Sequence, residues 1–143
     1  MPNYMAAVGG DYFGLNHDYF GHNHNHGAEL PRNVSTIVDL LEDAGISWGV
    51  YQESMPYTGF TESSYRNPET QASMYVRKHN PVILYGSVAQ REERLACIKN
   101  MTLFREDLER RRLPQWVRTT FDRRDWRKAD APPPDVYLAK HDL

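Results

Sequence analysis

The sequence contains a single cysteine, Cys97, so no internal disulfide bond can form. No apolar run approaches the roughly 20 residues that a membrane-spanning helix needs, and no signal peptide is evident after Met1. An excess of one charge is also missing, because 17 Lys and Arg stand against 19 Asp and Glu. This balance gives no electrostatic basis for binding nucleic acid. We therefore expect no nucleic-acid partner and no membrane span, and localisation stays open.

Several catalytic signatures are absent as well. The sequence has no Gly-rich phosphate loop, no Cys-x-x-Cys pair and no Gly-x-Ser-x-Gly elbow. Cys97 lies in an apolar pattern of helical spacing and is better explained as a small core residue than as a nucleophile. The 143 residues fit one domain or part of a larger one. We expect that domain over residues 1–121, followed over 122–143 by a poorly ordered tail containing three consecutive prolines.

Residues 33–53 indicate one helix followed at once by one strand. Ser35 or Thr36 can cap the helix, and Gly45 suits a left-handed residue at its end. The helix carries apolar residues at helical spacing, namely Ile37, Leu40, Leu41 and Ala44. The strand alternates apolar Ile46, Trp48 and Val50 with Ser47, Gly49 and Tyr51. A helix joined to a strand through one glycine is half of a βαβ unit and predicts an α/β fold with long loops.

Further helices and strands are predicted along the rest of the chain. Residues 2–8 favour a helix, and residues 113–117 begin a strand. A short helix is predicted over residues 69–78, and a strand or extended run over 82–85. The longest helical pattern, residues 89–112, predicts one helix or two with a break near Asn100.

A cluster of three histidines and one further histidine, His79, are the candidate functional residues. His22, His24 and His26 would share one side of an extended segment, which is a possible metal site, but a glycine-rich loop favours a solvated segment. His79 follows Arg77 and Lys78 and precedes Asn80. This string suits contact with an anion, although the residues alone favour a solvated turn at a helix end.

Six strings, in order along the chain, together resemble the fungal secreted acid phosphatases. They are Pro2–Asp11, Asn33–Trp48, Tyr51–Glu53, Met55–Phe60, Tyr75–Pro81 and Leu113–Trp116. These enzymes belong to the phosphoesterase family that also holds bacterial phospholipases C. The resemblance implies a partial alkaline-phosphatase-like α/β core. It also implies hydrolysis of phosphate monoesters by a Ser or Thr nucleophile, with a divalent metal that activates the hydroxyl and neutralises developing charge.

The sequence departs from that family at both ends of the resemblance. The family's nucleophile lies just ahead of the position of Pro2, and its early metal-binding segment lies further upstream. After Trp116 the family has a segment rich in metal ligands, where this chain has Val117–Trp126. We therefore expect no catalytic residue and no bound metal within this chain, which would be a truncated form, inactive alone.

Two positions retain a role implied by the resemblance. Asn3 would sit in the first turn after the nucleophile, and His79 would face the phosphate pocket. These two are the predicted substrate-binding residues. The alternative function is a non-enzymatic metal- or partner-binding fragment that uses His22, His24 and His26. Self-association is also expected, because a sheet without its flanking strands exposes edges.

Overall fold

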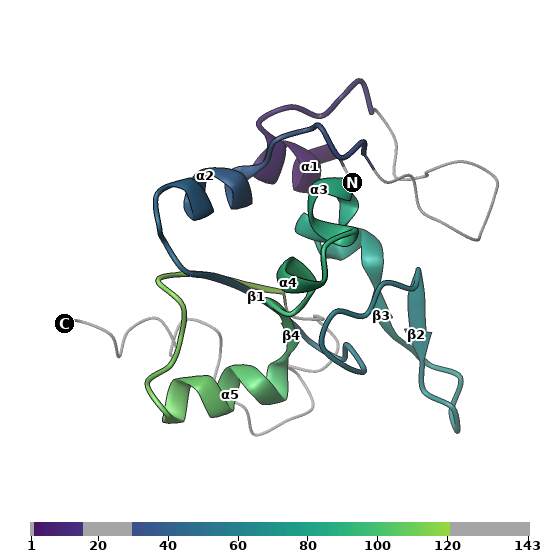
Figure 1. Cartoon of the computed structure of the whole chain (residues 1–143). Coiled ribbons are helices and arrows are strands. Elements are labelled where there is room, and N and C mark those ends of the chain that lie inside the picture. Colours follow the sequence, from purple (N-terminus) through teal and green to yellow (C-terminus); the bar gives the residue numbers. More distant parts are fainter. Residues whose placement is uncertain (1, 16–29, 121–143) are drawn as a thin grey trace.

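The computed structural model describes residues 2–15 and 30–120, and its centre is a three-stranded parallel sheet (Figure 1). The strand order is β4-β1-β5, with β1 at Trp48–Gln52, β4 at Ile98–Asn100 and β5 at Trp116–Thr120. Both neighbours run parallel to β1. All five residues of β1 are buried, as expected for a strand covered on both faces. The α/β class is confirmed, and the layers are consistent with a partial alkaline-phosphatase-like core.

Helices cover the two faces of the sheet. Helices α1 (Pro2–Gly9) and α2 (Ile37–Asp43) lie on one side of β1, and α5 (Met101–Glu109) lies on the other (Figure 1). On the α5 face, the Tyr51 ring stacks edge-on against Phe104 at 5.1 Å. On the opposite face, the Trp48 indole donates to Glu42 of α2 at 3.0 Å. No described helix is long and apolar enough to cross a membrane.

Helix α2 forms largely for the predicted reasons. Thr36 is the N-cap: its hydroxyl accepts from the Val38 N–H, and Asp39 reaches back to the Thr36 N–H at 2.7 Å. Gly45 has φ +67°, as a left-handed end requires. The predicted apolar stripe is wrong in part. Val38 and Leu41 face the core, whereas Leu40 is 68% exposed, because the helix is rotated so that Asp39 can meet a buried arginine.

The predicted helix over residues 69–78 is wrong. The chain forms a hairpin of β2 (Ser64–Arg66) and β3 (Ser73–Val76), followed by a 3₁₀ turn, η1 (Arg77–His79). The Asn67 side chain closes the hairpin by accepting from two backbone N–H groups, those of Glu69 and Thr70. The Tyr75 ring then packs edge-on against Phe60 at 5.5 Å. Pairing with β2 and packing of Tyr75 on Phe60 decide the structure over local helix propensity.

Two further expectations need correction. The apolar run at Val82–Leu84 is a 3₁₀ turn, η2, because Pro81 already holds helical backbone angles at its start. Residues 89–112 contain three short helices and a strand: the end of α3 (Gly86–Ala89), α4 (Glu92–Leu95), β4 and α5. Ile98 is fully buried beside Val50, and this pairing makes β4 a strand. The break near Asn100 is confirmed, since the Asn100 side chain caps α5. Cys97 lies in the turn before β4, half-buried, rather than in a helix.

Candidate functional site

The two predicted substrate-binding residues lie on segments that the fold brings together. Asn3 is exposed in the first turn of α1, and His79 is exposed as the last residue of η1. Tyr4, the neighbour of Asn3, places its ring 6.0 Å from the His79 ring. The start of α1 and the end of η1 therefore share one surface, although they are far apart in the sequence.

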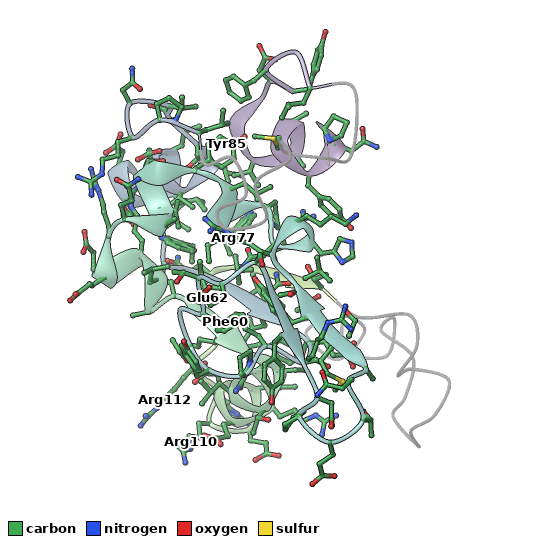
Figure 2. All side chains as sticks on the ribbon, turned by 90° about the vertical axis from the view of Figure 1, so that its right-hand side faces the viewer. Phe60, Glu62, Arg77, Tyr85, Arg110 and Arg112 are labelled. Carbon is green, nitrogen blue, oxygen red and sulfur yellow. The ribbon has the colours of Figure 1, made fainter. Side chains whose placement is uncertain are left out.

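Helix α1 is fixed in place by Tyr85. The buried Tyr85 hydroxyl donates to the Met5 carbonyl at 2.7 Å, and Met5 itself is fully buried in the core. A methyl group at Gly9 would overlap the Tyr85 hydroxyl, so the helix approaches the ring as closely as glycine allows. Figure 2 shows Tyr85 beside α1, well above Phe60 and Glu62, which precede the hairpin.

His79 lies at the carboxyl ends of two parallel strands. The Thr120 hydroxyl, at the end of β5, donates to the His79 carbonyl at 3.4 Å. Thr120 also accepts from the buried Gln52 amide, at the end of β1, at 3.2 Å. In open α/β sheets, ligands bind outside the carboxyl ends of the strands. His79 therefore lies at the edge of the sheet where this class of fold binds ligands.

Two of the four residues Arg77–Asn80 are buried, and the other two reach the surface. Arg77 is buried and donates to the carbonyls of Thr61 and Ile83 at 2.9 and 2.8 Å, and Figure 2 shows it inside the molecule between α1 and the hairpin. Asn80 is fully buried, with its amide 3.4 Å from the Tyr75 hydroxyl. Neither residue can face a substrate in solution. Only Lys78 and His79 keep the exposure that contact with an anion needs.

Arg118 was not singled out by sequence reasoning. It lies on β5 beside Val50 of β1, and its guanidinium carbon is 5.9 Å from the centre of the Tyr4 ring. Tyr4 therefore contacts both His79 and Arg118. An isolated arginine, in a segment that departs from the family pattern, carried no signal that would have found it.

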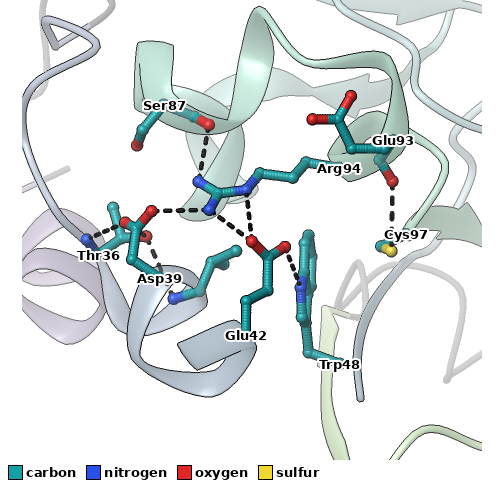
Figure 3. Close-up of polar contacts among 9 residues, drawn as sticks. Thr36, Asp39, Glu42, Trp48, Ser87, Glu93, Arg94 and Cys97 are labelled. Atoms are coloured by element: carbon teal, nitrogen blue, oxygen red, sulfur yellow. Dashed lines mark hydrogen bonds and ion pairs between the residues drawn. The ribbon is translucent and has the colours of Figure 1, made fainter. Parts of the chain in front are cut away.

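A second polar cluster is structural (Figure 3). The buried Arg94 guanidinium binds Asp39 at 2.7 Å, Glu42 at 2.6 Å and the Ser87 carbonyl at 2.8 Å. It thereby ties α2, α3 and α4 together. Burial alone would raise the pKa of Asp39, but the Thr36 N–H and Arg94 outweigh it and hold that pKa below its usual value. Each of the three guanidinium nitrogens of Arg94 already donates to a protein acceptor.

Metal binding by this chain was predicted from the sequence only as an alternative function, for three histidines. In residues 2–15 and 30–120, no three His, Cys, Asp or Glu side chains come together to hold a metal ion. His22, His24 and His26 lie outside the described residues. Their metal binding stays a prediction, which a zinc titration can test with those three residues substituted.

Fold and site together define a class: an α/β protein with polar side chains gathered at the carboxyl ends of parallel strands, where such proteins bind substrates. The chain belongs to the Phosphoesterase family, whose model matches residues 1–132.

Curated relatives agree with that assignment. The chain is 50% identical over 116 residues to an acid phosphatase of Aspergillus fumigatus, a match that covers 81% of this chain and 24% of the relative. It is 51% identical over 116 residues to a probable acid phosphatase of Kluyveromyces lactis, covering 81% and 26%. A phosphate-repressible acid phosphatase of Penicillium chrysogenum is 46% identical over 114 residues, covering 80% and 26%. The chain thus spans about a quarter of the length of these relatives.

Proposed function

We propose that this protein acts in the hydrolysis of phosphate monoesters and that residues 1–143 supply part of the surface that faces the phosphate. Membership of the Phosphoesterase family and similarity to proteins named acid phosphatase support this proposal. The substrate class is then a phosphate ester, and its phosphoryl oxygens need hydrogen-bond donors around them.

The observation that carries the proposal is the exposed imidazole of His79 beside the start of α1. An imidazole N–H donates to phosphate oxygens, and the charge of a protonated ring strengthens that bond. The Asn3 amide supplies further N–H donors, and the first turn of α1 presents backbone N–H groups that no helical carbonyl takes. Because Tyr85 and Met5 fix the helix, these donors need little reordering when an anion binds.

We further propose that residues 1–143 bind phosphate without turning over an ester. The family resemblance assigns neither the nucleophile nor the metal ligands to positions of this sequence. Within the proposal, the role of His79 and Asn3 is to orient the phosphoryl group. Bond cleavage belongs to groups outside this set.

Two measurements on the purified chain test the proposal. The first is p-nitrophenyl phosphate turnover at acidic pH, with and without added divalent metals; we expect no turnover above a heat-inactivated sample. Clear turnover that is lost on substituting a residue of this chain would contradict the second part of the proposal.

The second measurement is binding of inorganic phosphate, followed by calorimetry and by amide chemical shifts. We expect binding that His79→Gln weakens by roughly tenfold, as loss of one charge-assisted hydrogen bond predicts. The matched control is Arg105→Gln, which removes an exposed side chain on α5, on the other face of the sheet. Equal affinity in His79→Gln and Arg105→Gln would remove His79 from the proposed surface.

A further inference from the structure

Arg118 has hydrogen-bonding capacity that the described protein does not use. Its Nε is enclosed and has no hydrogen-bond partner in residues 2–15 and 30–120. Ion pairs among the described residues, such as those of Arg94 with Asp39 and Glu42 and of Lys99 with Asp107, do not include Arg118. An enclosed N–H without an acceptor is costly. Unlike the buried Arg77, Arg118 is only half-buried as a whole, so an anion that reaches its guanidinium and accepts a bond would be stabilising.

The position of Arg118 points to the surface around His79. Alternation along β5 places Trp116, Arg118 and Thr120 on one face of the sheet. This is the face of α1 and α2, because Trp116 and Thr120 pair in register with Trp48 and Gln52 of β1, and Trp48 bonds to α2. The last of the three, Thr120, holds the His79 carbonyl. Arg118 therefore lies two residues before Thr120 on the same face of β5, close to η1.

Tyr4 connects Arg118 to His79. The Tyr4 ring lies within 6.0 Å of the imidazole and within 5.9 Å of the guanidinium carbon. The aromatic face attracts the guanidinium and limits its rotation, but it accepts no bond from an N–H in the plane of the guanidinium. A held guanidinium with unused in-plane donors suits an acceptor that offers two oxygens side by side, as a phosphate does.

We infer that Arg118 is a phosphate-binding residue of this chain that acts beside His79. The inference rests on the proposed function, since it names a further contact on the same surface. It identifies the ligand as a tetrahedral oxyanion, free or as the phosphoryl group of an ester. Tyr4 is the positioning residue, since it holds the guanidinium and the imidazole at a common ring.

The test measures binding of inorganic phosphate to residues 1–143 by calorimetry. Arg118→Met keeps the length of the apolar stem and removes the donors, and we expect it to weaken binding by roughly tenfold to a hundredfold. Arg118→Lys keeps the charge but loses the paired donors, and it should fall between Arg118→Met and the parent chain. The control Arg112→Met removes an exposed arginine in the segment after α5, which Figure 2 shows at the opposite end of the molecule from Tyr85. Its affinity should not change.

The outcomes separate this inference from the proposed function. If His79→Gln weakens phosphate binding while Arg118→Met and Arg118→Lys bind like the parent chain, the surface stands and the role of Arg118 is overturned. If the parent chain shows no binding, both fail. Should Arg118→Met not fold, as judged by its thermal transition, Arg118→Lys decides: unchanged affinity contradicts the inference, and a loss supports it. A change in the NMR chemical shifts of the Tyr4 ring protons when phosphate is added, absent in Arg118→Lys, would support the role of Tyr4 as the ring that holds both groups.

Discussion

At the scale of single residues, Tyr85 decides where helix α1 lies. Its hydroxyl donates to the Met5 carbonyl, and Gly9 leaves room for its ring. Burial raises the pKa of Tyr85 to about 12. Since the start of α1 carries Asn3 and Tyr4, loosening this anchor would change the candidate site without touching it.

We expect Tyr85→Phe to lower the free energy of unfolding by about 1–2 kcal/mol at pH 7, because the buried Met5 carbonyl loses its donor. The folded pKa lies above the unfolded value of about 10. The contribution of the hydroxyl is therefore complete below pH 10 and is lost as pH rises toward 12. Urea unfolding of both proteins between pH 7 and pH 11 measures this. The control is Tyr57→Phe, at an exposed tyrosine; equal losses in the two variants would contradict the anchoring role.

Individual residues also show how much of the candidate site could be predicted from the sequence. His79 and Asn3 were predicted from strings that resemble a family, and the fold brings their segments to one surface. Arg77 and Asn80 looked equivalent to His79 in the sequence but are buried. Their orientation depends on carbonyls and rings of distant segments, which local pattern cannot encode. Arg118 was missed for the same reason, because its significance comes from Tyr4 at the other end of the described chain.

At the scale of elements, helix α2 depends on one charged cluster. Asp39 caps the helix through Thr36 and pairs with Arg94, whose side chain is 4% exposed. The pKa of Asp39 is held below its usual value of 3.8 despite the opposing effect of burial. A carboxyl group whose folded pKa is lowered stabilises the protein above its unfolded pKa and loses that effect as pH falls through the folded pKa.

We predict that Asp39→Asn lowers the unfolding free energy by about 1–2 kcal/mol at neutral pH, through the lost ion pair and the weakened cap. The gap between the variant and the parent should be complete above the unfolded pKa of about 4 and should close as pH falls through the lower folded pKa, since protonation then neutralises the parent as well. The measurement is urea unfolding from pH 7 to pH 2.5. Asp43→Asn, at the exposed end of the same helix, is the control; a gap that is constant with pH would contradict the ion-pair account.

Elements with local signals were predictable, and those made by distant pairing were not. The capping residues and Gly45 define the ends of α2 by short-range hydrogen bonds, so the sequence located that helix and the strand after it. Strand β4 has three residues and is a strand because Ile98 pairs with Val50. Strand β3 likewise depends on its partner and on Phe60. Both were predicted as helix, since their own residues favour neither state strongly.

At the scale of the whole molecule, the strand order is the feature that no local pattern contains. The helix–strand unit predicted an α/β fold, and the parallel sheet confirms it. Strand β1 lies at the centre between β4 and β5, so the connection through α5 crosses from one edge of the sheet to the other. This crossing brings Thr120 and Arg118 beside η1 and α1, and the candidate site is its consequence.

The outer edge of β5 carries the last prediction, which concerns self-association. The Trp116 N–H and the Thr120 carbonyl bond toward the β1 side, so by alternation the N–H groups of Val117 and Thr119 point away from it. In the described part of the chain, no strand pairs with that outer edge, and an open edge is a template for another chain. We expect residues 1–143 to self-associate as concentration rises, measured by sedimentation velocity.

Thr119→Pro should shift the chain toward monomer, because it removes an outward N–H while leaving the β1 ladder intact. Thr119→Val, which keeps that N–H and the strand propensity, should associate like the parent chain. Association unaffected by the proline would show that another surface is responsible, and a parent chain that stays monomeric at every concentration would contradict the prediction.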